Sequence, residues 1–165
     1  MKQRAFTLME LMIVIVIIGI LSAVGMVMFG GQAEKAKIAA AKSNHKSVVK
    51  YISVEVMKCE LGETSVMDGE LLCSNANIGI KIAEAALRNA NTSKTLSNIK
   101  NPYDTKVLSL RKQSGHSTGA DADVGYINVG GHNTIPLVAV NGCVALKCDP
   151  TPNRIWANLC FQTSC

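Results

Sequence analysis

Cysteines carry the clearest chemistry in the sequence, and all of them lie outside its long apolar segment. Their positions are Cys59, Cys73, Cys143, Cys148, Cys160 and Cys165. An even number of distal cysteines is typical of disulfides formed in an oxidising compartment. A zinc site is the alternative, but no CxxC pair occurs and no histidine stands at ligand spacing from a cysteine. We therefore expect three disulfides and no bound metal.

The pairing of these cysteines is only partly constrained by the sequence. Cys59 and Cys73 bracket a short loop and are expected to form one bridge. The other four allow three pairings, among which the sequence cannot choose. If the last two strands form a hairpin about residue 151 or 152, Cys143 faces Cys160, which leaves Cys148 with Cys165. We favour this arrangement over two short local loops, and each bridge would stabilise the fold by about 2–4 kcal/mol.

One carboxylate, Glu10, stands at the edge of an apolar run that has no charged residue from Leu11 to Phe29. As a helix this run spans about 28 Å, which is the thickness of the hydrocarbon core of a bilayer. A charge that enters the bilayer centre costs on the order of 2.5 kcal/mol or more, so Glu10 is expected to have a partner. The alternative is a position at the headgroup level, where water solvates it.

The remaining titratable residues form no constellation that predicts catalysis. The histidines at 45, 116 and 132 are scattered, and no GxxxxGK[ST], HExxH or GxSxG motif occurs. We predict that the chain is not an enzyme and needs no cofactor. A calcium site that uses Asp104, Asp121 or Asp123 is a minor alternative, and Asn91-Thr92-Ser93 matches a glycosylation acceptor by pattern only. The net charge of +5 is weak evidence for binding nucleic acid.

The basic residues before the apolar run predict its orientation. Lys2 and Arg4 should stay cytoplasmic, so that the rest of the chain faces outward. A cleaved secretory signal would have a shorter apolar region followed by a small-x-small site. A plain membrane anchor explains the length of the run but not Glu10.

The first residues resemble a known family. The segment Ala5-Phe6-Thr7-Leu8-Met9-Glu10-Leu11-Met12-Ile13-Val14 closely resembles the processing site and first helix of type IV pilins and pseudopilins. The resemblance implies that a prepilin peptidase cuts between Ala5 and Phe6 and that the new amino terminus at Phe6 is methylated. Glu10 then becomes the fifth residue of the mature chain, where the family keeps its glutamate.

Two features depart from the family pattern. Ala5 stands where the family usually has glycine before the cut, and the first helix lacks the proline that many type IV pilins have, expected near Val27. Each glycine in a helix weakens it by roughly 1 kcal/mol relative to alanine. We therefore expect bending or local melting between Gly25 and Gly31 without a proline kink. The glycines concerned are Gly19, Gly25, Gly30 and Gly31.

Glu10 gains a physical role if this cleavage occurs. The amine of Phe6 in one copy could pair with Glu10 of a neighbour in a bundle of staggered, parallel helices. Leaving either charge unpaired in such a core is strongly unfavourable, so the pair would fix the axial register of the subunits. Thr7 could add a hydrogen bond between helices.

The helix is expected to continue with a different character from Gln32 to Lys58. One stripe recurs every three or four residues and should pack on a sheet: Ile38, Ala41, His45, Val48, Ile52, Val56 and Cys59. The opposite face carries Lys37, Lys42, Lys46 and Lys50. The row of lysines is interpreted as a solvated or inter-subunit face, and His45 as a core or edge histidine.

Short strands follow a connector that itself includes a helix at 78–89. Strands are expected at 106–110, 124–129, 134–140, 143–147 and 154–161, with Asn141-Gly142 as a hairpin turn. The sequence thus predicts an α+β fold in which a long N-terminal helix packs against an antiparallel β-sheet. The expected division is 1–5 leader, 6–31 membrane and assembly helix, 32–60 amphipathic helix, 61–104 connector, and 105–165 sheet and cysteine-rich region.

These features favour a structural subunit, or pilin, of an extracellular type IV pilus for adhesion, motility or DNA uptake. Its precursor would sit in the inner membrane. Its expected partners are many copies of itself, a prepilin peptidase, an inner-membrane assembly platform, minor pilins, and DNA or surfaces. Two alternatives remain open: a pseudopilin of a type II secretion system, and a membrane-tethered DNA- or ligand-binding module.

Overall fold

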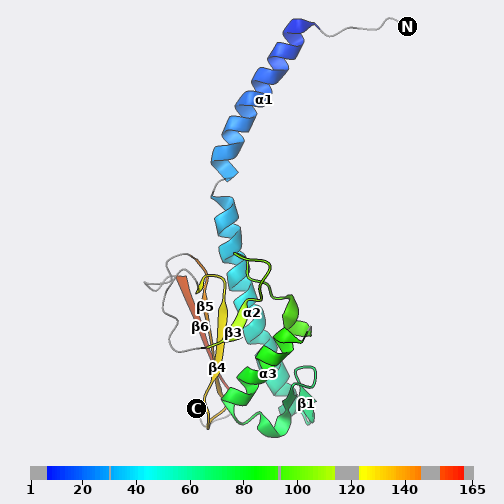
Figure 1. Ribbon diagram of the computed structural model, residues 1–165, viewed down its shortest axis with the longest axis vertical. Coiled ribbons are helices and arrows are strands. Elements are labelled where there is room, and N and C mark those ends of the chain that lie inside the picture. Colours follow the sequence, from blue (N-terminus) through cyan, green and yellow to red (C-terminus); the bar gives the residue numbers. More distant parts are fainter. Residues whose placement is uncertain (1–6, 30, 93, 114–122, 146–152, 162–165) are drawn as a thin grey trace, which may run out of the picture. The chain divides into compact units, whose positions relative to one another are not determined.

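The computed structural model describes residues 7–29, 31–92, 94–113, 123–145 and 153–161 (Figure 1), and the chain divides into two units. The first unit is Met1–Ala36 and the second is Lys37–Cys165. Several residues singled out above lie outside the described ranges: Ala5, Phe6, Gly30, Ser93, His116, Asp121, Cys148 and Cys165. The description below takes each unit by itself.

The first unit contains helix α1, Leu8–Phe29, and the start of helix α2, Gln32–Glu60. All side chains from Leu8 to Val24 are exposed within the chain. Gly31, between the two helices, lies in a turn. Helix α1 therefore has an apolar surface that its own chain does not bury.

In the second unit, α2 packs through the stripe that its sequence predicts. Five members of the stripe are buried, namely Ala41, His45, Val48, Ile52 and Val56, while Ile38 and Cys59 are partly buried. The four lysines of the opposite face are exposed. Glu55 is buried on the same side as the stripe, although the spacing of apolar residues does not predict a buried charge there.

The sheet contains four strands, β3 (Leu110–Lys112), β4 (Ile127–Gly131), β5 (Leu137–Cys143) and β6 (Arg154–Cys160), in that spatial order. β4, β5 and β6 are antiparallel, whereas β3 runs parallel to β4. The expected α+β fold is confirmed, with a sheet that is mostly antiparallel. Its inner face joins α2 and α3 (Gly79–Asn91) in one apolar core.

Helix α3, which was expected at 78–89, begins against the strands in an unusually close backbone contact. The N–H groups of Gly79 and Ile80 donate to the carbonyls of Ile135 and His132, both at 2.9 Å. A Cβ on Gly79 would lie 2.0 Å from the carbonyl oxygen of Leu137, and one on Gly131 would lie 2.1 Å from the backbone of Gly79. Only glycine fits at these two positions.

The expected hairpin turn at Asn141-Gly142 is wrong, because both residues lie inside strand β5. Tertiary packing overrides the local turn signal: a Cβ on Gly142 would lie 3.1 Å from the side chain of Ile155, so glycine allows the close approach of β6. Strand β5, which ends at Cys143, therefore takes the place of the two strands expected at 134–140 and 143–147. The last expected strand, 154–161, matches β6.

The register of β5 and β6 also corrects the expectation that Cys143 faces Cys160. Cys143 pairs with Arg154 and Cys160 pairs with Leu137. These pairs lie at opposite ends of β6, about 20 Å apart, whereas a disulfide needs Cα atoms within about 7 Å. Cys143 and Cys160 are each disulfide-bonded, so each has another partner.

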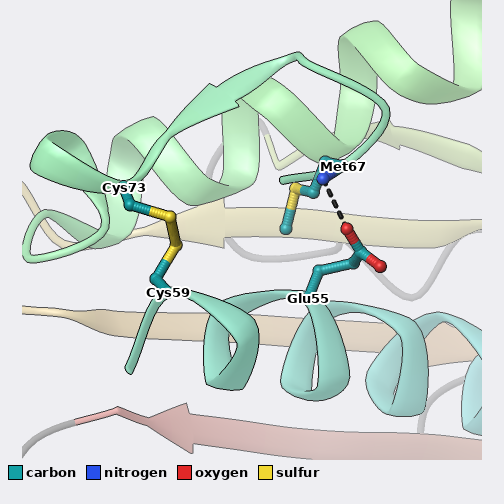
Figure 2. The surroundings of a disulfide bond; sticks show 4 residues. All are labelled: Glu55, Cys59, Met67 and Cys73. Carbon is teal, nitrogen blue, oxygen red and sulfur yellow. Dashed lines mark hydrogen bonds between the residues drawn. A yellow bond between two sulfur atoms is a disulfide. The ribbon is translucent and has the colours of Figure 1, made fainter. Parts of the chain in front are cut away.

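A small hairpin follows α2 and is fixed to it by a disulfide. Strands β1 (Ser65–Val66) and β2 (Leu71–Leu72) pair with each other, and the 3-10 helices Cys73–Asn75 and Thr95–Asn98 flank the region. The expected bridge between Cys59 and Cys73 is present, with Cα atoms 5.3 Å apart (Figure 2).

Candidate functional site

The start of α1 is organised by a hydrogen-bonded pair, Thr7 and Glu10. The backbone N–H and the hydroxyl of Thr7 both donate to Oε2 of Glu10 at 2.9 Å, and the N–H of Glu10 lies 3.3 Å from the Thr7 hydroxyl oxygen. This arrangement is a capping box, in which two side chains satisfy the free donors at a helix start. The contact holds the Glu10 carboxylate beside the first turn of the helix.

The geometry leaves part of this carboxylate for a partner outside the chain. Both hydrogen bonds from Thr7 end on Oε2, and Glu10 is exposed. Oε1 can therefore accept from a second donor without opening the cap. A cationic amine is the donor that a carboxylate at the edge of an apolar segment prefers.

The rest of α1 forms a long apolar surface. Residues Leu8–Gly25 are long and apolar enough to cross a membrane, by length and composition, and none of this segment is buried. Its large side chains are between 47% (Val14) and 80% (Leu8) exposed. Such a surface needs lipid or other helices around it.

In the described part of the first unit, Gly19, Gly25 and Gly31 have no neighbours that require glycine. A Cβ at Gly19, Gly25 or Gly31 would meet nothing within 4 Å. Their role in bending or melting the helix stays a prediction, as does the role of Gly30 outside the described residues. The hydrogen bond expected between helices at Thr7 is likewise a prediction, since the hydroxyl described here donates to its own chain.

A second cluster, in the second unit, holds the disulfide loop against α2. Buried Glu55 accepts the N–H of Met67 and forms an ion pair with Lys58, next to the Cys59–Cys73 bridge (Figure 2). Met67 is fully buried at a positive φ of 56°, and Asn89 donates to its carbonyl at 3.1 Å. Glu55 was missed because only apolar positions were sought, although it lies three residues after Ile52 on the stripe.

Charged residues around this loop form an ion-pair network at the surface. Glu70 pairs with Lys94 at 2.8 Å and with Arg88 at 3.1 Å. The hydrogen bond from Lys94 lowers the pKa of Glu70, and the one from Asn89 lowers the pKa of Asp68. This cluster supports the loop, and its charges are balanced.

The other candidate residues do not converge. His45 lies against β5 with Nε2 3.0 Å from the Val140 carbonyl oxygen, and His132 is exposed. Asp123 is ion-paired with Arg111, and Asp104 accepts from the N–H of Lys106 at 3.1 Å. Within the described ranges, no three His, Cys, Asp or Glu residues gather in a way that could hold a metal ion.

Comparison with known proteins identifies the N-terminal segment. Residues 1–26 match the family model of the prokaryotic N-terminal methylation motif. No curated protein and no solved structure matches the chain. The chain therefore carries a class III prepilin leader, which is typical of type IV pilins and pseudopilins and implies processing by prepilin peptidase and assembly into filaments.

Proposed function

We propose that this chain is a structural subunit of an extracellular type IV pilus that serves adhesion, motility or DNA uptake. The observation that carries the proposal is the methylation motif, which continues into an apolar helix unburied in its own chain. Pilin-like proteins are generally structural and not enzymes. The precursor is held in the inner membrane by α1 and passes, after processing, into the filament.

The physical basis of assembly is the burial of α1 among copies of itself. At about 25 cal/mol per Å² of apolar surface, packing a helix of this length against neighbours contributes many kcal/mol. Apolar packing does not select an axial position by itself, because the helix has similar side chains along its length. A charge near its start supplies that selection.

Glu10 supplies this charge, and its partner is the Phe6 amine of an adjacent copy. The capping box holds the carboxylate at the helix start before assembly. A subunit added in the wrong register would leave a carboxylate and an amine unpaired in an apolar environment, which costs about 3–5 kcal/mol. Cleavage after Ala5 is therefore required for correct assembly, because it creates the amine.

In this proposal Gly30 and Gly31 form a flexible joint between the membrane helix and the amphipathic helix, and Gly25 weakens the end of α1 that precedes it. Helix α1 ends at Phe29 and α2 begins at Gln32. A joint at this point would let α1 pack among other copies while the second unit keeps its own fold. The disulfides then protect that unit in the extracellular environment.

Purified surface fibres provide the test. We expect mass spectrometry of fibres sheared from intact cells to show this chain as an abundant component that begins at a methylated Phe6 and contains only oxidised cysteines. If the processed chain is found in the cell envelope and is absent from surface fibres, the subunit belongs to a secretion pseudopilus instead. A chain that keeps residues 1–5 contradicts both versions.

A further inference from the structure

The C-terminal end of α2 presents the most exposed large apolar side chain that the structure describes. Leu61 is 85% exposed, which is more than any large apolar residue described in α1. Val54 and Met57 precede it at helical spacing and are also exposed, so the three side chains lie along one side of the helix. These three residues are here called the α2 ridge. An exposed apolar ridge of this kind marks a contact with another molecule.

The end of the ridge is held in place by a helix cap and a disulfide. Gly62 has a φ of +97°, and its N–H donates to the carbonyl of Cys59 at 3.2 Å, while the N–H of Glu63 donates to that of Lys58 at 3.2 Å. These two bonds form a Schellman motif, and the disulfide from Cys59 to Cys73 fixes the same turn. A backbone that is already ordered lowers the entropy cost of binding, so this end of the ridge is suited to anchor a contact.

A hollow of about 450 Å³ lies between α3 and the strands β3, β4 and β5. It is open because several residues of its lining are too small to fill the space between larger apolar neighbours. The small residues include Ala83, Gly130 and Ala139, and the larger ones include Ile80, Leu87 and Leu137. A hollow with such walls accepts an aliphatic side chain.

The charge beside the ridge is negative. Glu60 and Glu63 flank Leu61 and are exposed. Neither carboxylate takes part in an ion pair within the described part of the chain. The nearby Lys58 is already paired with the buried Glu55. The carboxylates beside Leu61 are therefore available to a cation of another molecule.

The charge beside the hollow is positive. Lys112 lines the hollow, is exposed, and has no ion-pair partner among the residues that the structure describes. Glu84 of the same lining is paired with Lys81 at 3.8 Å, and His132 and Gln113 complete its polar part. An apolar side chain flanked by carboxylates therefore fits this hollow better than one flanked by cations.

We propose that Leu61 of one copy inserts into the hollow of the next copy, with Glu63 paired to Lys112. This inference rests on the proposed function and names a contact between second units in the filament. The ridge and the hollow are different surfaces of one chain, so the contact between copies is heterologous. A heterologous contact can repeat without closing, and repeated contacts of this kind build a helical filament. Burial of the leucine favours the contact, and the charge pair orients it.

Photocrosslinking in intact fibres tests the contact directly. Met57→p-benzoylphenylalanine places a probe one turn before Leu61, and co-expression with the native chain lets native copies carry assembly. We expect irradiation to give covalent multimers in which position 57 is joined to residues 80–87, 112 or 129–139 of another copy, as identified by mass spectrometry. The same probe at Asn158, an exposed position on β6, should not reach these residues.

The outcomes separate this inference from the proposed function. Fibres that contain the chain, with a probe at position 57 that joins only other surfaces or forms no multimers, overturn the inference and leave the proposed function in place. A native chain that forms no polymer overturns both.

Two substitutions test the anchor and its charge pair. Leu61→Ser removes the apolar anchor at an exposed position, so we expect the fibre yield to fall at least about fivefold while the unfolding temperature changes little. Leu61→Met keeps an apolar side chain and should assemble normally. Lys112→Glu should lower the yield as well, whereas Lys106→Glu, at an exposed lysine outside the lining of the hollow, should not. Native yield from both Leu61→Ser and Lys112→Glu, or equal losses from their controls, overturns the inference.

Discussion

At the scale of single residues, the second unit depends on buried polar side chains whose hydrogen bonds join separate segments of the chain. Glu55 is one of them, because it joins α2 to the loop between β1 and β2 through Met67. A backbone N–H at a buried turn needs an acceptor, and a carboxylate is a strong one. Helix α2 thus holds the loop through Glu55 and packs on the sheet through its apolar stripe.

Replacing Glu55 with glutamine should destabilise the second unit. Glutamine keeps one oxygen for Met67 but loses the charge and the ion pair with Lys58. We expect a loss of about 1–3 kcal/mol in the free energy of unfolding, measured by urea denaturation. The matched control is Glu60→Gln on an exposed position of the same helix, which should change stability by less than about 0.5 kcal/mol. Equal effects of the two changes would contradict this role of Glu55.

His45 should make stability depend on pH. Burial lowers the pKa of His45 in the folded chain, and its neutral Nε2–H is placed to donate to the Val140 carbonyl. The unfolded chain, with an ordinary histidine pKa near 6.5, then binds more protons than the folded chain below that pH. Stability is therefore complete above about pH 6.5 and falls as the pH drops below it.

The measurement is the unfolding temperature between pH 7.5 and pH 5. We expect His45→Phe to flatten the decrease, whereas His132→Gln, at an exposed histidine, should leave it in place. A decrease that survives in the His45 variant would assign the pH dependence to other groups.

At the scale of elements, the sequence predicted those parts whose pattern is long and regular. The stripe on α2, helix α3 and strand β6 were all expected from spacing and composition. The hairpin expected at Asn141-Gly142 does not form, because a two-residue signal carries less weight than the packing of Ile155 against Gly142. The sequence of neither β3 nor β4 predicts their parallel pairing. The direction of pairing depends on the edge of the sheet at which the chain enters β4.

The candidate site shows the same division. Glu10 and Thr7 were recognised from the sequence, yet the capping box between them was missed although Thr7-Leu8-Met9-Glu10 fits its signature. The alignment of four residues across the sheet was not predicted at all. These residues come from four strands and are brought together only by the strand register: Arg111, Asn128, Asn141 and Trp156.

The contact of α3 with the strands predicts a strict requirement for glycine. An alanine Cβ at Gly131 would lie 2.1 Å from the backbone of Gly79, and no flexible side chain is there to move. We expect Gly131→Ala to cost about 1–3 kcal/mol or more in stability, because α3 must shift away from β4. Gly19→Ala, where a Cβ meets nothing within 4 Å, is the control and should not lower stability. An unchanged unfolding temperature for Gly131→Ala would contradict the close packing described here.

At the scale of the whole molecule, the chain combines a second unit whose apolar core is buried with an apolar helix whose side chains are exposed. The core of the second unit joins α2, α3 and the sheet, whereas none of the segment Leu8–Gly25 is buried. Folding of one chain therefore leaves the long apolar surface of α1 uncovered. In the proposed function, lipid covers this surface before assembly and copies of the same helix cover it in the filament.

The test of this view is a variant that keeps the helix start and removes only the charge. Glu10→Gln meets that condition, because glutamine can close a capping box as glutamate does. We expect the variant to reach the membrane in native amounts and to be processed, while the yield of fibres falls at least about tenfold for want of a partner for the Phe6 amine. Glu60→Gln should assemble normally. Native fibre yield from Glu10→Gln would show that apolar packing alone sets the register, and the proposed role of the carboxylate would have to be abandoned.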